Sequence, residues 1–347
     1  MLARVKFPAP TFARKIHRHF FPPPLLLLYH RVAEVDLNPQ GLCVSPSHFR
    51  AQLLALKARA KILPLTELVE NIRAHRLPPR AVAITFDDGY VDNLQNALPI
   101  LEATRTPATI FIPSGFVGAP REFWWDALES LLLFPGQFSE TIALEINGRR
   151  REWNLGEAAI FTAENFARHR AWHVQEPQTP TPRHALYREL CALLQPLPQP
   201  AQEAALSQLR RQISAHQPPR DERRCVTAEE LTLLAQNPLI AIGAHTATHR
   251  YLSAATRPEQ SSELRASKSA LEKMLARPIP GLAFPHGNYT SETIEETSAA
   301  GFDFAVTTEP RALRRGENLH EIPRCVVGDW DAGTFLEKLV EWQGLHP

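Results

Sequence analysis

Short apolar runs recur along the chain, and most of them end in polar or turn-forming residues. Runs of this length are typical of strands buried on both faces of a parallel sheet. The expected strands are residues 25–32, 61–65, 81–86, 108–112, 239–243, 281–284, 303–306 and 322–327. Segments between several of these runs carry apolar residues at helical spacing, so strands and helices alternate. This alternation predicts an α/β fold built on a parallel sheet or barrel.

The same pattern predicts helices between and beside these runs. They cover residues 49–57, 67–76, 93–104, 123–133, 183–194 and 202–214. Thr66 is expected to cap the second of them. The sequence Thr-Ala-Glu-Glu places Glu230 three residues after Thr227, which predicts a capping box at the start of a further helix.

The regular alternation is interrupted between residues 120 and 225. An amphipathic helix with Trp124 and Trp125, a hairpin turned at Asn147-Gly148 and several helices marked by prolines are expected there. The two tryptophans either face a substrate or pack against the barrel, and packing is the more ordinary role. We therefore divide the chain into a basic arm (1–24), a first barrel part (25–119), an insertion or cap (120–225) and a second barrel part (226–347).

The run at residues 81–86 leads directly into Asp87, Asp88 and Gly89. Adjacent strand residues point in opposite directions, so the two carboxylates can serve one site only if the backbone turns there. Gly89 supplies such a turn. A plain Asp-Asp-Gly turn between strand and helix is the alternative interpretation.

Three histidines also follow expected strands. His30 ends the first apolar run, which makes it a candidate acid or base, and a satisfied core histidine is the alternative interpretation. His245 and His249 follow residues 239–243 and are expected on one helical turn, where two imidazoles can converge on a metal ion. His169 and His173 have the same spacing, but they lie in a polar part of the insertion and are expected on a solvated face. One Asp with two His suits a catalytic Zn²⁺ or a similar divalent ion with open coordination positions.

The composition indicates which binding partners and which cellular compartment to expect. The 347 residues include 38 Lys and Arg against 37 Asp and Glu, so there is no basic excess to suggest nucleic acid as a partner. The four cysteines are widely spaced, which fits reduced thiols and favours a cytoplasmic protein. The basic first segment has no continuous apolar stretch of the kind a signal peptide needs. It is expected to be a solvated terminus, with peripheral contact to the inner face of the membrane as the alternative.

Two motifs together carry a resemblance to a known family. Thr85-Phe86-Asp87-Asp88-Gly89, followed later by His245-Thr246-Ala247-Thr248-His249, resembles the first two motifs of the polysaccharide deacetylases, also called NodB-homology proteins or family 4 carbohydrate esterases. The resemblance implies a distorted (β/α) barrel of the NodB type. It implies that Asp87 is the general base and that Asp88, His245 and His249 hold a divalent metal ion. Zn²⁺ is the expected ion, with Co²⁺, Ni²⁺ or Fe²⁺ as other possibilities.

The catalytic acid is displaced relative to the usual family pattern. Leu28-Tyr29-His30 resembles permuted members that act on poly-N-acetylglucosamine, in which the catalytic histidine precedes the Asp-Asp motif. By this resemblance His30 is the acid. Leu319-His320 precedes a strand rather than ending one, so His320 is the weaker alternative.

The later family motifs are also altered. Pro285 and His286 lie in the third motif, which lacks its usual arginine, and Arg324 is the hypothesis for the residue that orients Asp87. Asp329-Trp330 resembles the fourth motif, whose Asp engages that arginine in the family. A backbone N–H near Tyr90 is expected to hold the oxyanion. Tyr90, Pro285, His286, Asp329 and Trp330 are therefore the expected substrate-binding residues.

The resemblance implies a metal-dependent N-deacetylase that releases acetate from an N-acetylated amino sugar. The expected substrate is a lipid-linked, nucleotide-linked or oligosaccharide precursor of a surface polysaccharide. Two alternatives stay open at this point: hydrolysis of a cyclic amide on the same barrel, and a catalytically silent module that binds glycan.

Overall fold

A curled parallel sheet forms the centre of the molecule. The computed structural model describes residues 22–213 and 220–344, so most of the predicted basic arm lies outside the described residues. Within those ranges one sheet has eight strands in the order β13-β12-β11-β6-β5-β1-β14, with β4 paired to β5. Their bounds are β1 (Leu25–Tyr29), β4 (Lys61–Ile62), β5 (Ala81–Phe86), β6 (Ala108–Ile112), β11 (Ile240–Ala244), β12 (Gly281–Ala283), β13 (Phe304–Val306) and β14 (Cys325–Val326).

The register of the sheet brings the ends of the central strands together. Tyr29 of β1 pairs with Phe86 of β5, and the N–H of Asp87 donates to the carbonyl of Tyr29 at 3.1 Å. On the other side of β6, Ala244 of β11 pairs with Ile112. Because all these strands are parallel, the residues that follow them emerge at one edge of the sheet. His30, Asp87 and His245 therefore leave the same edge.

Residues 319–327 close the gap between the two outer parts of the sheet. The N–H of Ala305 in β13 donates to the carbonyl of Leu319, and Val306 forms a parallel bridge with Ile322. Cys325 then pairs with Leu27 of β1. This crossing segment curls the sheet into the expected NodB-type barrel, and it places Arg324 beside the end of β5.

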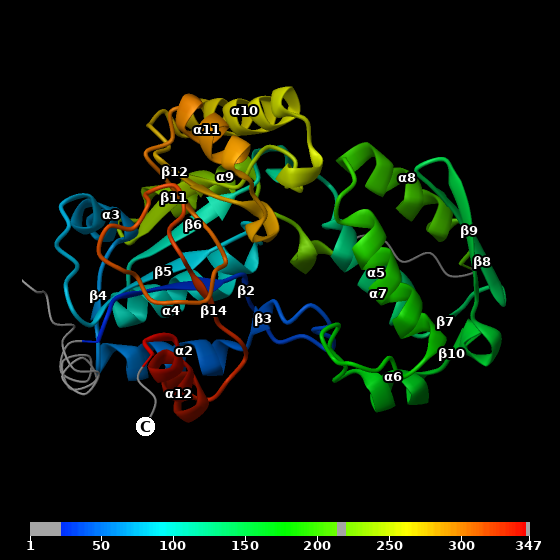
Figure 1. The fold of residues 1–347 in the computed structure, drawn as a ribbon. Coiled ribbons are helices and arrows are strands. Elements are labelled where there is room, and N and C mark those ends of the chain that lie inside the picture. The colour runs from blue at the N-terminus through cyan, green and yellow to red at the C-terminus, as the bar shows by residue number, and fades with distance from the viewer. Residues whose placement is uncertain (1–21, 214–219, 345–347) are drawn as a thin grey trace, which may run out of the picture.

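Seven helices within the described residues flank the barrel strands (Figure 1). They are α2 (Pro46–Lys57), α3 (Leu65–Arg73), α4 (Leu98–Thr104), α9 (Ala228–Gln236), α10 (Arg257–Leu275), α11 (Ser291–Ala299) and α12 (Ala332–Trp342). Helices α2 and α12, from opposite ends of the chain, lie side by side. Each buries one apolar face, as Phe49, Leu53 and Leu56 of α2 show. No helix in the described ranges is long and apolar enough to cross a bilayer.

The inserted residues form a layer of their own beside the barrel, drawn in green in Figure 1. Its elements are α5 (Trp124–Leu132), β7 (Gly136–Gln137), β8 (Thr141–Ile146), β9 (Arg149–Asn154), β10 (Ile160–Phe161), α6 (Ala163–His169), α7 (Pro182–Leu194) and α8 (Gln199–Arg210). Arg183 of α7 is fully buried and donates to the carbonyls of Gly136, Ala158 and Ala159. This guanidinium therefore satisfies backbone groups that would otherwise be buried without partners.

Several local predictions are confirmed and others are wrong. The hairpin turn at Asn147-Gly148 forms between β8 and β9, and Thr227 and Glu230 form the predicted capping box. Thr66 does not cap α3, because Leu65 is buried and already lies in the helix, with Pro64 as its N-cap. The helix expected over residues 93–104 begins as a π-helix, η1 (Asn93–Ala97). Pro99, which lacks an N–H, follows that irregular turn.

Candidate active site and metal centre

The Asp-Asp turn directs its two carboxylates to different partners. Asp88 and Gly89 both have left-handed backbone conformations, with φ of 71° and 62°. A Cβ atom at position 89 would lie 2.4 Å from the Cδ1 atom of Ile112, which would have to move, and the left-handed backbone itself favours glycine. Both carboxylates are nearly fully buried. The turn sends Asp88 towards two histidines and Asp87 towards an arginine.

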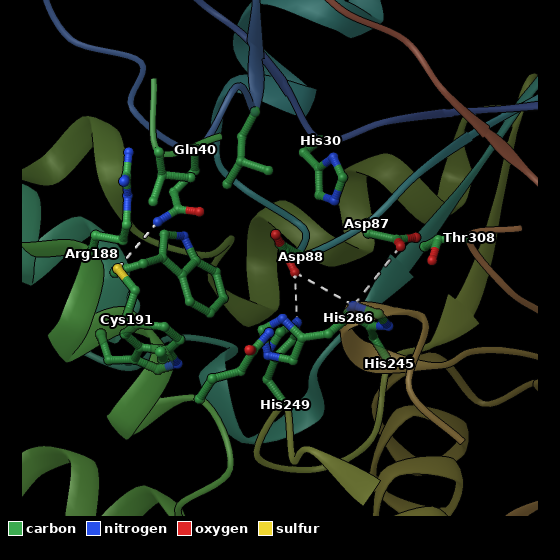
Figure 2. A pocket seen from close by; sticks show the side chains of 16 residues that line it. His30, Gln40, Asp87, Asp88, Arg188, Cys191, His245, His249, His286 and Thr308 are labelled. Carbon is green, nitrogen blue, oxygen red and sulfur yellow. Dashed lines mark hydrogen bonds and ion pairs between the residues drawn. The ribbon is translucent and has the colours of Figure 1, made fainter. Parts of the chain in front are cut away.

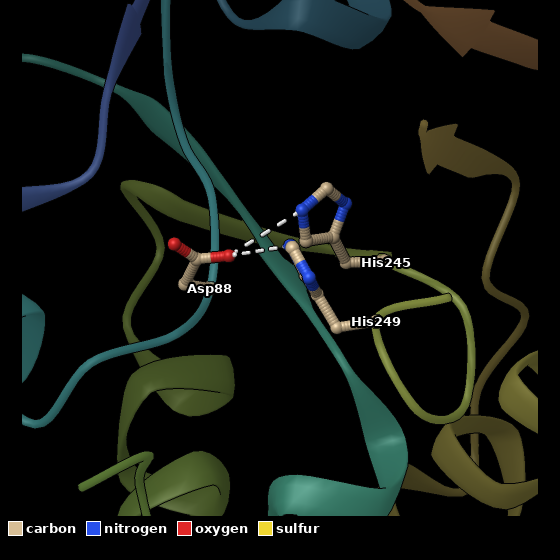
Figure 3. Close-up of side chains that lie close together, drawn as sticks. All are labelled: Asp88, His245 and His249. Carbon is tan, nitrogen blue, oxygen red and sulfur yellow. Dashed lines mark ion pairs between the residues drawn. The ribbon is translucent and has the colours of Figure 1, made fainter. Parts of the chain in front are cut away.

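Asp88, His245 and His249 form a compact cluster (Figure 3). One ligand atom from each residue lies within 4.8 Å of the others. The Oδ1 atom of Asp88 is 3.1 Å from Nε2 of His249 and 3.5 Å from Nε2 of His245. The expected helical turn is wrong: residues 245–249 form a loop in which Thr246 and His249 have φ of 60° and 56°. The two left-handed residues bend the loop so that the imidazole centroids are 4.8 Å apart.

The donor set of this cluster fits a divalent metal ion. Nδ1 of His245 lies 2.8 Å from the carbonyl oxygen of Ala283 and donates to it, so Nε2 is the ring nitrogen that faces Asp88 and could bind an ion. Oδ1 of Asp88 is buried without a hydrogen-bond partner among the described residues. Burial alone would raise the pKa of Asp88, but His245 and His249 lower it well below its ordinary value. A buried carboxylate oxygen facing two imidazole nitrogens is the ligand type that Zn²⁺ prefers.

Asp87 is held by a buried guanidinium. Nη1 and Nη2 of Arg324 donate to Oδ1 and Oδ2 of Asp87, each at 2.7 Å. Nε of Arg324 donates to the carbonyl of Thr307 at 2.8 Å, which fixes the plane of the guanidinium group. Burial acts to raise the pKa of Asp87, but Arg324 lowers it below the ordinary value. The carboxylate is thus ionised and fixed in orientation, with Oδ2 at 3.9 Å from Nε2 of His245.

His30 lines the same cavity as the metal cluster. In Figure 2 its ring lies on one side of Asp87 and Asp88, and His245, His249 and His286 lie on the other. The pKa of His30 is lowered, because burial outweighs the neighbouring carboxylates of Asp88 and Asp87, which favour its protonated form. His320 lies elsewhere, with Nε2 at 2.9 Å from the carbonyl oxygen of Phe302.

The cavity has a volume of about 340 Å³ and is bounded by the barrel on one side and the insertion on the other. Besides the residues described above, its walls are formed by Gln40, Leu42, Trp124, Trp125, Val174, Arg188, Cys191, Ala192, Gln195 and Thr308. Trp124 and Trp125 are almost fully buried, as packing predicts, and they line the cavity, so contact with a substrate stays a prediction. The sequence interpretation missed Gln40, Arg188, Cys191 and Gln195. These residues lie in no recognisable motif, and only the packing of the insertion brings them to the site.

The residues of the third and fourth motifs separate in the structure. His286 lines the cavity, with its ring centroid 4.6 Å from that of His249, whereas Pro285 is buried outside the cavity wall. The expectation that Asp329 engages Arg324 is wrong. Asp329 instead accepts hydrogen bonds from the N–H and Oγ of Ser45, both at 2.9 Å, and pairs with His48 at 2.7 Å.

Of the two remaining expected contacts with substrate, the structure contradicts that of Trp330 and leaves that of the Tyr90 backbone untested. Trp330 packs against Trp342 and is not part of the cavity wall. The side chain of Tyr90 is fully buried and points into the insertion, so only its backbone remains a candidate for contact with substrate. His169 packs against His184, while His173 is exposed, and the two form no metal cluster within the described residues.

Comparison with known proteins agrees with this geometry. The family model described as polysaccharide deacetylase matches residues 74–133 and 185–305. A poly-beta-1,6-N-acetyl-D-glucosamine N-deacetylase of Staphylococcus aureus is 37% identical over an alignment of 107 residues that covers 27% of this chain and 37% of that protein. YxkH of Bacillus subtilis is 29% identical over 116 residues, which are 33% of this chain and 41% of YxkH. The matched regions thus span less than half the length of these relatives.

Two solved structures share the fold. The deacetylase PplD of Streptococcus pyogenes superposes with a TM-score of 0.56 at 17% identity, covering 92% of this chain and 99% of PplD. IcaB from Ammonifex degensii gives a TM-score of 0.56 at 16% identity, covering 93% of this chain and 97% of IcaB. At this level of identity the likeness concerns the fold alone.

Proposed function

The chain belongs to the polysaccharide deacetylase family, and we propose that it is a metal-dependent N-deacetylase acting on an N-acetylated amino sugar. One observation carries the proposal. A buried cluster of Asp88, His245 and His249 lies beside an ionised Asp87 on the wall of a single cavity. A polar cluster of this kind is costly to bury unless it binds a ligand.

The residues divide the hydrolysis between them. Asp88, His245 and His249 would hold the ion, for which Zn²⁺ is proposed and Co²⁺, Ni²⁺ or Fe²⁺ are alternatives. When bound, such an ion polarises the acetyl carbonyl and lowers the pKa of water towards about 7. Asp87, held as a carboxylate by Arg324, accepts the proton of the attacking water.

The remaining steps concern the oxyanion and the amine. The backbone N–H of Tyr90, two residues after Asp88, is proposed to donate to the developing oxyanion. His30 is proposed to donate a proton to the departing amine. It lies on the opposite side of the carboxylates from His249 and His286 (Figure 2), so base and acid are separate residues. The products are acetate and a free amine on the sugar.

The proposed substrate is a glycan or a glycan precursor of a surface polysaccharide. The name of the Staphylococcus aureus relative supports N-acetylglucosamine as the sugar. The cavity is bounded by Trp124, Trp125 and Leu42 together with the polar side chains of Gln40 and Gln195, and a sugar offers both apolar faces and hydroxyl groups to such walls. Lipid-linked, nucleotide-linked and oligosaccharide forms are all included in the proposal.

A cytoplasmic location stays part of the proposal. Its support is that Cys43, Cys191, Cys225 and Cys325 are buried free thiols, as expected in a reducing compartment. Peripheral contact with a membrane would involve residues 1–21, which lie outside the described residues.

Acetate release from a panel of N-acetyl sugars tests the proposal. The panel contains free, nucleotide-linked and lipid-linked sugars and poly-β-1,6-N-acetylglucosamine, assayed after chelation and again after addition of Zn²⁺ or Co²⁺. We expect release that is lost on chelation and restored by metal. Tight metal binding without acetate release from any member would overturn the proposal and favour a cyclic-amide hydrolase or a glycan-binding module.

A further inference from the structure

The loop that carries Asp88 is fixed by the end of the insertion. The N–H of Val91 donates to the carbonyl of Arg224, and the N–H of Val226 donates to the carbonyl of Gly89, both at 3.0 Å. These bonds flank an antiparallel bridge between Tyr90 and Cys225. The backbone from Gly89 to Val91 is therefore clamped to residues 224–226.

The side chain of Tyr90 extends this attachment into the insertion. Its phenol O–H donates to Oδ2 of Asp126 at 2.6 Å, and its oxygen accepts from Nε1 of Trp125 at 2.9 Å. Nη1 of Arg223 donates to the other oxygen of Asp126 at 2.8 Å. Tyr90 is fully buried, and Asp126, Trp125 and Arg223 are at most 5% exposed. Each polar group in this network thus depends on its protein partners.

The ring of Tyr90 is held from two further sides. The guanidinium of Arg31 lies 4.7 Å from its centroid, and the ring of Phe123 lies 5.1 Å from it. Arg31 is itself fixed by Asp92, with Nε 2.8 Å from Oδ2. Rotation of the phenol ring would require several buried contacts to break together.

Trp125 links this network to the other part of the metal cluster. Its indole donates to Tyr90, while its ring centroid lies 5.0 Å from that of His249. The same side chain lines the cavity. One residue of the insertion therefore touches both the residue two positions after Asp88 and the ring of a second candidate metal ligand.

We propose that Tyr90 is a positioning residue. Through the hydrogen bonds of its phenol group, the insertion sets the geometry of the active site. The inference rests on the proposed function, because Asp88 and the Tyr90 N–H lie on the loop that the phenol anchors. Without the phenol O–H, Asp126 and Trp125 lose their shared partner and the loop loses its side-chain anchor. Groups that support a metal site in this way typically change affinity or activity by about 10- to 100-fold when removed.

The test compares Tyr90→Phe with Tyr29→Phe in the full-length protein. Tyr29 is also fully buried, and its O–H makes one hydrogen bond, to Gln52 at 3.1 Å, inside the barrel core. We expect Tyr90→Phe to lower kcat about tenfold or more with little change in KM, and to weaken Co²⁺ binding about tenfold, measured from the visible Co²⁺ spectrum against a competing chelator. Tyr29→Phe should keep the wild-type kcat and Co²⁺ affinity despite a similar loss of thermal stability.

A second variant covers the case in which Tyr90→Phe does not fold. Asp126→Asn keeps the size of the side chain but removes the charge that Arg223 and the phenol share, so kcat and Co²⁺ affinity should fall in the same direction. Wild-type kcat and Co²⁺ affinity in the folded Tyr90 or Asp126 variant would overturn the inference. If the wild-type protein releases no acetate at all, the proposed function fails, and Co²⁺ affinity alone still decides the positioning role.

Discussion

Arg324 binds both carboxylate oxygens of Asp87, at 2.7 Å each, across 237 positions of the sequence. Arg324 is fully buried, and it precedes β14, the strand that pairs with β1 next to β5. A planar guanidinium offers two parallel N–H groups that match both oxygens, whereas an ammonium group is a point charge without this fixed geometry. The pair therefore fixes the direction in which Asp87 presents its lone pairs.

Replacing the guanidinium group of Arg324 should impair catalysis more than it impairs folding of the barrel. We expect Arg324→Lys to lower kcat by about 100-fold, because displacement of a reacting group on the order of 1 Å has such an effect. Arg311→Lys is the matched control, since Arg311 also binds both oxygens of one carboxylate, that of Glu317, but lies outside the cavity wall. Steady-state kinetics on both variants would refute the role of Arg324 if the two kcat values were equal.

Metal binding should stabilise the folded protein. A ligand that binds the native state at about 100 times its Kd contributes about 2.7 kcal/mol, which predicts a rise in Tm of about 5 °C. Scanning calorimetry of the chelated protein with and without Zn²⁺ measures this. Asp88→Ala removes the oxygen that faces His245 and His249, so its Tm should not respond to Zn²⁺. An equal shift in the variant would place the binding site elsewhere.

The two candidate acids predict opposite kinetic results. His30 lies in the cavity, so His30→Gln should lower kcat by about 100- to 10,000-fold, the usual contribution of a positioned acid or base. His320 contacts the carbonyl of Phe302 outside the cavity, so His320→Gln should keep kcat close to that of the wild type. The assay is acetate release under saturating substrate. Loss of activity in the His320 variant alone would reverse the assignment.

Asp329 should matter for stability and not for catalysis. It accepts from Ser45 at the N-terminus of α2, so Asp329→Ala should lower the free energy of unfolding by about 1 kcal/mol and leave kcat unchanged. Burial would raise the pKa of Asp329, but its bonds to Ser45 and His48 lower it. The stabilisation is therefore complete above the ordinary carboxyl pKa and is lost as the pH falls through the lowered one. Urea unfolding at neutral and at acidic pH measures both effects, and a large loss of kcat would contradict this role.

The sequence predicted the parts of the site that depend on local pattern. Asp87, Asp88, His30 and His245 each follow a buried run, and parallel strands bring such positions to one edge. The helical turn at His249 failed because a helix is the commoner way to bring residues four apart together, whereas this loop uses two left-handed residues. The spacing of His245 and His249 correctly indicated that their side chains lie close together, although the predicted helical conformation was wrong.

Contacts that depend on tertiary packing were harder to predict. The role expected of Asp329 came from the order of the motifs along the chain. That order contains no information about which residues touch in space, and Asp329 contacts Ser45 and His48. Arg188 belongs to the insertion and Gln40 to the first barrel part, and both line the cavity because these two parts of the chain pack side by side. The buried network around Tyr90 and Asp126 likewise joins two segments whose proximity no short sequence pattern reveals.

The central claim is that Asp87 acts as the base beside a metal ion held by Asp88, His245 and His249. Acetate release by the wild type and by Asp87→Asn, with metal content measured in both, tests it most directly. Asparagine keeps the shape of the side chain and leaves the three ligands in place, but it cannot accept the proton. We expect equal metal content and a fall in kcat of about 100- to 10,000-fold. Wild-type kcat in the metal-loaded variant would contradict it.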